Sequence, residues 1–166
     1  MNSMLCQRLV VALEGTPDVL DALVGAIEPG NPVWDFRPYA DRFTLREIIA
    51  HVTDYEFVWL DRLIRTRDVR GVVFERGDPS KLAVENDYEH SDPLANLKLF
   101  RERRAKIVNL VNSCNDADWL LTSTLPAPIG LVSLEYHACF VPIHDGYHTG
   151  QVTQWLGLNR LPREKE

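Results

Sequence analysis

The sequence has 166 residues, a hydrophobic fraction of 45% and a net charge of −6, values typical of a soluble globular protein. This length fits one domain spanning residues 1–166, whose core needs neither disulfides nor a structural metal. The acidic balance disfavours nucleic acid as a partner, and no apolar run approaches the roughly 20 residues of a membrane-spanning helix. The basic run that begins at Arg101 is expected to be a solvated helix face.

Cysteine usage and the first residues of the chain favour a cytoplasmic protein. Cys6, Cys114 and Cys139 are an odd number at irregular spacing, which is typical of reduced thiols rather than of a disulfide framework. The N-terminal segment lacks the basic start and long apolar run of a signal peptide, because Glu14 and Asp18 follow almost at once.

Two long helices are predicted in the first half of the chain. The first covers about residues 3–28, where apolar residues recur at helical spacing, although Pro17 could break or restart it. The second begins at Thr44, because Thr44 and Glu47 form the pattern of a capping box. A long apolar stripe follows on one helix face: Leu45, Ile48, Ile49, Val52, Tyr55, Trp59 and Leu63.

Loops and two further helices are predicted after this point. Residues 68–92 should form a loop that could hold one short helical turn, and a third helix should cover residues 93–113. A second loop, residues 115–130, could contain an extended piece. The fourth helix is predicted for residues 133–156, with a kink at Pro142 and an end at Gly157. Four helices with long connecting loops predict an all-α protein, a four-helix bundle.

The fourth helix carries His144 and His148, four residues apart on its apolar arc. At this spacing the Cβ atoms lie about 6 Å apart, so two ring nitrogens can bind one metal ion. His51, at the border of the apolar stripe of the second helix, can supply a third imidazole across a helix seam. A hydrogen-bonded structural role is the alternative for the pair, and it is the preferred interpretation of His137 and His90.

The segment from His144 to His148 is also similar to the zinc-protease signature, in which a glutamate after the first histidine acts as general base. Asp145 takes that position and is one methylene shorter, and Gly146 lowers helix propensity by about 1 kcal/mol. These departures disfavour a protease. Motifs for a serine nucleophile or a phosphate-binding loop are not visible, and Cys139 should point away from the histidines.

Two segments, FRPYADRFTLREIIAHVTDYEFVWLDRL and HDGYHTGQV, together resemble the DinB superfamily, which includes the YfiT-like proteins. The resemblance covers most of the chain. Its motifs lie in a Trp- and Pro-containing loop, at the start and middle of the second helix, and in the last helix. The matching residues are Trp34, Pro38, Thr44, Glu47, His51, Glu56, His144, His148, Gly150 and Gln151.

The resemblance implies a four-helix bundle that binds one divalent metal ion, usually zinc or nickel, through His51, His144 and His148. Relatives include thiol S-transferases that use bacillithiol and a mycothiol-dependent isomerase, and others are described as metal-dependent hydrolases. The family also suggests a homodimer. Aromatic residues fit that suggestion, although core packing explains them equally: Trp59, Trp119 and Trp155.

The leading hypothesis is therefore a metal-dependent thiol S-transferase that acts on a small electrophilic substrate with a low-molecular-weight thiol as cosubstrate. Three imidazoles leave an open position where bound water reaches a pKa near 7 or a thiol is held as thiolate. Gln151 and Tyr147 are expected near this position as catalytic residues. Glu47 could orient His51, although capping is the preferred interpretation. The alternatives are hydrolysis by metal-bound hydroxide and a non-enzymatic dimer that binds metal or senses a ligand.

Overall fold

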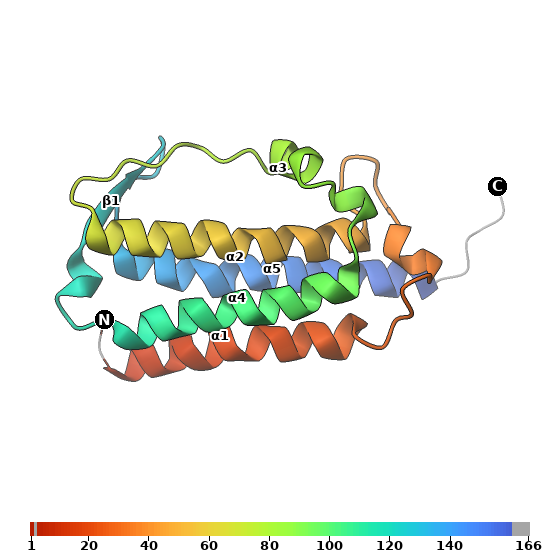
Figure 1. Ribbon diagram of the computed structural model, residues 1–166, viewed down its shortest axis with the longest axis horizontal. Helices are drawn as coiled ribbons and strands as arrows, with labels where there is room; N and C mark the ends of the chain where they lie inside the picture. Colours follow the sequence, from red (N-terminus) through yellow and green to blue (C-terminus); the bar gives the residue numbers. More distant parts are fainter. Residues whose placement is uncertain (2, 161–166) are drawn as a thin grey trace.

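A computed structural model describes residues 1 and 3–160, and four long helices dominate it (Figure 1). They are α1 (Ser3–Val24), α2 (Leu45–Asp68), α4 (Pro93–Ser113) and α5 (Leu134–Arg160). α1 and α2 each pack against both α4 and α5, so the helices surround a shared core. The predicted four-helix bundle is confirmed. Within the described part of the chain, no helix is long and apolar enough to span a membrane.

Short elements fill the connections between the long helices. The helical turn expected within residues 68–92 is α3, and the extended piece expected within residues 115–130 is an antiparallel hairpin, β1–β2. The short elements are η1 (Pro32–Asp35), α3 (Pro79–Glu85), η2 (Tyr88–His90), η3 (Asp118–Leu120), β1 (Thr122–Leu125) and β2 (Gly130–Ser133).

The segment after α2 is held against the hairpin before it crosses back over the bundle (Figure 1). Thr124 donates to the carbonyl of Val72 and accepts from the amide of Phe74, both at 2.9 Å. Val72 and Phe74 are buried in a small apolar cluster with Leu125 and Val132. This second, smaller core fixes the start of the long connection above α2.

The start of α2 is fixed by the predicted capping box. The side chain of Thr44 accepts from the amide of Glu47 at 3.2 Å, and the Glu47 carboxylate accepts from the amide of Thr44 at 2.6 Å. Arg37 donates to the same carboxylate oxygen at 2.9 Å. Because Oε2 of Glu47 is engaged by the cap and by Arg37, capping accounts for this residue.

The helix ends differ from the sequence-based expectation. α1 ends at Val24 rather than near residue 28, and it continues through the buried Pro17. α5 is one continuous helix across Pro142, and it passes Gly157 to end at Arg160. A proline inside a helix costs about 3 kcal/mol and a glycine about 1 kcal/mol. Burial of neighbouring apolar side chains offsets such costs, and local propensity does not report it.

All four tryptophans are buried. Trp59 and Trp119 belong to one core cluster and Trp34 and Trp155 to a second cluster. Each is at most 3% exposed, so core packing explains these side chains. They are not available as an interface.

A buried ionic cluster lies between the two apolar clusters and joins the long helices. Arg104 of α4 is 1% exposed and forms ion pairs with Glu56 of α2 at 2.6 Å and Asp145 of α5 at 2.7 Å. Arg104 also donates to the carbonyl of Leu13, and Thr16 donates to Asp145 at 3.0 Å, so α1 takes part as well.

The basic run was expected to be solvated, and for Arg104 this expectation is wrong. The two carboxylates that pair with Arg104 come from distant parts of the sequence, so the run itself carries no sign that one arginine turns inward.

Arg104→Met should lower the free energy of unfolding by about 3–5 kcal/mol, because it leaves two buried carboxylates without a cation. Arg101→Met is the matched control on the same helix, since Arg101 also pairs with two carboxylates, Asp18 and Asp21, but is 47% exposed. This control should lose no more than about 1 kcal/mol. Urea denaturation followed by circular dichroism measures both values. Similar losses in the two variants would contradict a central role for Arg104.

Candidate functional site

The three histidines singled out from the sequence lie together across the seam between α2 and α5. His144 and His148 are one helical turn apart on α5, with ring centroids at 4.5 Å. The ring of His51 on α2 lies 5.4 Å from that of His144 and 4.6 Å from that of His148. One ring nitrogen from each residue can be chosen so that all three lie within 4.8 Å of one another. This is a spacing at which three imidazoles can share one ion.

All three imidazoles are neutral at ordinary pH. Burial, together with the neighbouring histidines, lowers the pKa of His51 to about 3 and that of His144 to about 2. Burial also lowers the pKa of His148. A neutral imidazole keeps a lone pair on one nitrogen, which is the form that binds a metal ion.

Hydrogen bonds fix the tautomer of His148. Its Nδ1 lies 2.8 Å from Oε1 of Gln151, and an amide oxygen only accepts, so this nitrogen carries the proton. Nε2 of His148 is left with its lone pair. The amide of Gln151 donates in turn to the hydroxyl of Tyr147 at 3.3 Å, and Arg42 donates to the same hydroxyl at 3.3 Å.

The state of Nδ1 of His51 indicates that the site suits a cation. Its Nδ1 is buried and has no hydrogen-bond partner among the described residues. A buried polar atom in this state is costly unless a bound ligand satisfies it. Three neutral imidazoles with one unpartnered nitrogen fit a divalent ion of the kind that prefers nitrogen ligands. Glu47, which could have oriented His51, serves the helix cap instead.

Aromatic rings hold the imidazoles in place. Tyr55 stacks on His144 with a centroid distance of 4.9 Å and an interplanar angle of 15°, and Trp59 meets the same imidazole edge-on at 5.4 Å. Phe43 lies 5.5 Å from His51. These contacts restrict the rotation of the imidazoles and exclude water from one side of the cluster.

The histidines line an open pocket of about 410 Å³. Tyr147 and Gln151, expected near the site from the sequence, both line it. Residues from the loop before α2 and from the start of α3 complete the wall, and sequence reasoning missed them because no periodic pattern marks loop residues. The added residues are Asp41, Arg42, Phe43, Pro79 and Ser80, together with Tyr55 of α2.

The pocket wall offers little acid–base chemistry from carboxylates. Among its described residues the only carboxylate is that of Asp41, whose side chain is 82% exposed. Asp145, at the position of the protease general base, is turned into the bundle and binds Arg104. This geometry supports the expectation that the site is not that of a protease.

The two other histidines have structural partners. His137 is buried, with its Nε2 2.8 Å from the hydroxyl of Ser123, and burial lowers its pKa to about 4. His90 is exposed and lies 2.7 Å from a carboxylate oxygen of Asp87, whose hydrogen bond raises the His90 pKa. Neither lines the pocket of the three histidines.

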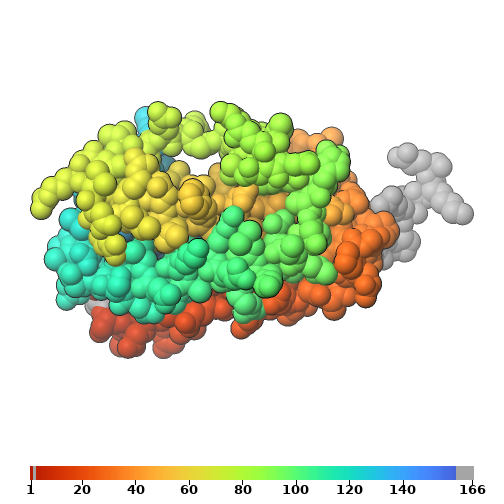
Figure 2. All heavy atoms as spheres, viewed as in Figure 1, coloured from red at the N-terminus to blue at the C-terminus, as the bar shows by residue number. Residues whose placement is uncertain are grey.

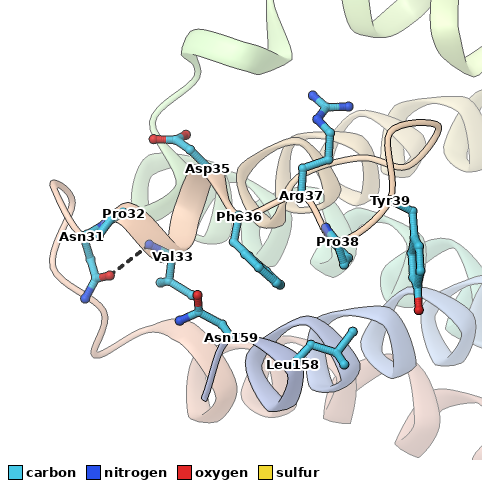
Figure 3. A pocket seen from close by; sticks show the side chains of 10 residues that line it. All are labelled: Asn31, Pro32, Val33, Asp35, Phe36, Arg37, Pro38, Tyr39, Leu158 and Asn159. Atoms are coloured by element: carbon cyan, nitrogen blue, oxygen red, sulfur yellow. Dashed lines mark hydrogen bonds between the residues drawn. The ribbon is translucent and has the colours of Figure 1, made fainter. Parts of the chain in front are cut away.

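A larger cavity of about 780 Å³ lies between the η1 segment and the end of α5 (Figure 3). Its two charged lining residues point away from it and are already paired, Asp35 with Arg46 and Arg37 with Glu47, both at 2.9 Å. No histidine or cysteine lines it. This cavity therefore offers fewer reactive groups than the pocket of the three histidines.

The sequence matches the DinB superfamily over residues 12–152. The chain belongs to this family. The matched span includes all three clustered histidines, the pocket around them and nearly all of the bundle.

A solved structure shares the fold. It is YfiT from Bacillus subtilis, described as a probable metal-dependent hydrolase with an unusual four-helix bundle topology. The TM-score is 0.84 over 93% of this chain and 87% of that chain, at 17% sequence identity. Among curated proteins, none matches the sequence significantly.

Proposed function

We propose that the protein is a divalent-metal-dependent enzyme with His51, His144 and His148 as metal ligands. The observation that carries the proposal is the convergence of three neutral, largely buried imidazoles, with nitrogens within 4.8 Å of one another, on an open pocket. The unpartnered Nδ1 of His51 adds to it. Zinc and nickel are the candidate metals, since both accept imidazole ligands readily.

The chemistry follows from the donor set. When bound, an ion with three imidazole ligands acts as a Lewis acid and lowers the pKa of a thiol or water molecule in its remaining position. Gln151 would hold the Nε2 lone pair of His148 toward the ion by accepting a hydrogen bond from the Nδ1–H group. Loss of such a partner typically costs ten- to hundredfold in metal affinity.

Tyr147 is suited to act on the substrate. Its hydroxyl accepts from both Arg42 and Gln151, so its own proton remains available to donate to a group in the pocket. We assign Tyr147 as the donor that assists the electrophile or its leaving group. Gln151 positions Tyr147 as well as His148.

Transfer of a thiol to a small electrophile is the reaction that we favour. A thiol ionises near pKa 8.5, far more easily than water, so a site whose described lining holds a single, largely exposed carboxylate suits a thiol better. In this reaction the thiolate sulfur forms a bond to the electrophilic carbon, and the leaving group departs with its electron pair. The free cysteines of the chain fit a reducing cytoplasm, where such thiols are available.

Hydrolysis is the second candidate. It is favoured by the fold match to YfiT, which is described as a probable metal-dependent hydrolase. The same ligands and the same pocket would serve it, with water in place of the thiol. The two reactions differ in whether turnover requires an added thiol.

The protein is further proposed to form a homodimer through the outer face of α5, defined here as Tyr136, Phe140, Ile143 and Tyr147. These residues recur at helical spacing and are 36–63% exposed, although the opposite side of α5 is buried in the core. A helix that is apolar on both sides normally buries both. None of the four side chains is itself charged, which suits contact between two copies that each carry a net charge of −6.

Wild-type protein incubated with Zn²⁺ or Ni²⁺ and desalted should retain about one ion per chain, as measured by elemental analysis. The His51→Ala, His148→Ala double variant should retain almost none, because one imidazole cannot hold the ion. His90→Ala, which alters an exposed histidine outside the pocket, is the control and should match the wild type. Equal metal content in the double variant and the wild type would rule out the assigned ligands.

Metal-loaded protein should consume low-molecular-weight thiols, such as cysteine and glutathione, in the presence of a small electrophile. The rate should exceed that of metal-stripped protein and of the double variant by about a hundredfold or more. Turnover of the same substrates without any thiol would favour the hydrolase. Metal binding with no turnover of either kind would favour the non-enzymatic alternative.

Ile143→Asp should convert a dimer into a monomer in sedimentation velocity, because it places a charge in the proposed interface. Val84→Asp is the control, since Val84 is 83% exposed on α3 and lies outside the outer face of α5. A wild-type protein that sediments as a monomer at high concentration would overturn the proposed dimer.

A further inference from the structure

Arg62, near the histidine pocket, has no ion-pair partner among the described residues. Arg62 of α2 is partly buried, and its guanidinium carbon lies 5.1 Å from the ring centre of Trp59 and 5.9 Å from that of Phe74. Among the described residues it forms no hydrogen bond and no ion pair, and burial lowers its pKa. Its neighbour Arg65 also stacks on Phe74 but is paired with Asp61 at 3.3 Å. A partly buried cation that forms no ion pair favours an anion from outside the chain.

Tyr55 places a second unpaired donor beside Arg62. Its ring covers His144, whereas its hydroxyl faces the segment above α2, where a Cβ at Gly77 would lie 3.8 Å from the hydroxyl oxygen. This hydroxyl makes no hydrogen bond within the described residues. A tyrosine hydroxyl can donate a hydrogen bond, so this group is available to a ligand in the cavity.

Arg62 and Tyr55 line a cavity of about 210 Å³ between α2, the segment above it and the turn of the hairpin. Figure 2 shows an opening beneath this segment. The volume suffices for a carboxylate or phosphate group with several waters, since one water occupies about 30 Å³ in the liquid. The charged lining is Arg62, Arg76 and Glu75, and Glu75 does not pair with Arg62.

Specific contacts hold the walls of this cavity in place. The segment above α2 is anchored by the hydrogen bonds of Val72 and Phe74 to Thr124, and Phe74 is itself one of the rings beneath Arg62. Tyr55 lines both this cavity and the pocket of the three histidines. One ligand that extends past Tyr55 could therefore reach both spaces.

We propose that this cavity binds a carboxylate or phosphate group of the substrate or of the thiol cosubstrate, with Arg62 and Tyr55 as hydrogen-bond donors. The geometry of the cavity, with Arg62 and Tyr55 in its lining, supports the anion site by itself. Its link to a reactive end beside His144 rests on the proposed function. The ligand predicted in this way is a small anionic molecule with its charged group on one side of Tyr55 and its reacting atom on the other.

The test uses metal-stripped protein labelled with 5-fluorotryptophan, because Trp59 lies beneath the guanidinium of Arg62. Inorganic phosphate, acetate and malonate are titrated at constant ionic strength, with chloride as the balancing salt. The fluorine resonance of Trp59, assigned with Trp59→Phe, should shift in a saturable manner, and that of the buried Trp34 should not. The probe that binds most tightly distinguishes phosphate from carboxylate.

Variants decide whether Arg62 holds the anion. Arg62→Met, which keeps the length of the side chain, should weaken binding by at least about tenfold, and Tyr55→Phe should weaken it less. Arg65→Met is the matched control and should bind as the wild type does, because Arg65 already has a carboxylate partner. Equal midpoints of thermal unfolding would show that the variants are folded. Identical titrations of the wild type and Arg62→Met, or an equal shift with chloride alone, would overturn the proposal.

A second measurement tests the link to the reaction. In metal-loaded protein, Arg62→Met should raise the KM for an anionic electrophile or thiol about tenfold with little change in kcat, and leave a neutral analogue unaffected. An equal change in KM for the neutral analogue would overturn the link. Because the titration needs neither metal nor turnover, failure of the proposed enzyme activity would leave its outcome intact.

Discussion

The geometry of the bundle depends on one buried ionic cluster. Arg104 binds Glu56 and Asp145 with four hydrogen bonds of 2.6–3.0 Å, and Leu13 and Thr16 complete it from α1. Apolar side chains tolerate rotation and sliding of a helix, whereas a buried arginine with two carboxylates is satisfied in few arrangements. Because the charged groups lose their hydration on burial, such a cluster adds little to the free energy of folding. Its contribution is to select one rotation of each helix, and loss of one member strongly destabilises the fold.

This constraint acts directly on the histidines. Asp145 follows His144 in α5, and Glu56 lies between His51 and Trp59 on the inner side of α2, so both helices of the site are fixed next to the clustered histidines. Arg104 also turns the carboxylates into the bundle and away from the pocket. Apart from the largely exposed Asp41, the reactive groups in the pocket lining are imidazoles, phenols and arginine, a set that suits a metal-activated nucleophile and an anionic reactant.

Local patterns predicted most of the fold, but only part of the site. The capping box of Thr44 and the four-residue spacing of His144 and His148 are local, and the structure has both as expected. The position of His51 depends on which face of α2 meets α5, and periodicity could only place it at a border. Arg104 was misassigned because its partners are 48 and 41 residues away. Residues such as Arg42 lie in loops, where no repeat marks a functional side chain.

The distribution of charge in the two cavities supports the proposal of a small anionic ligand, which the net charge of the chain alone would not suggest. The chain carries −6, yet the linings of the two cavities that share Tyr55 contain three arginines, Arg42, Arg62 and Arg76, against two carboxylates, Asp41 and Glu75. Arg62 forms no ion pair among the described residues, and within a partly buried recess its charge acts at a lower effective dielectric than it would on the open surface. A divalent ion at neutral histidines would add to this positive charge. An acidic net charge is thus compatible with the proposed recess for small anions.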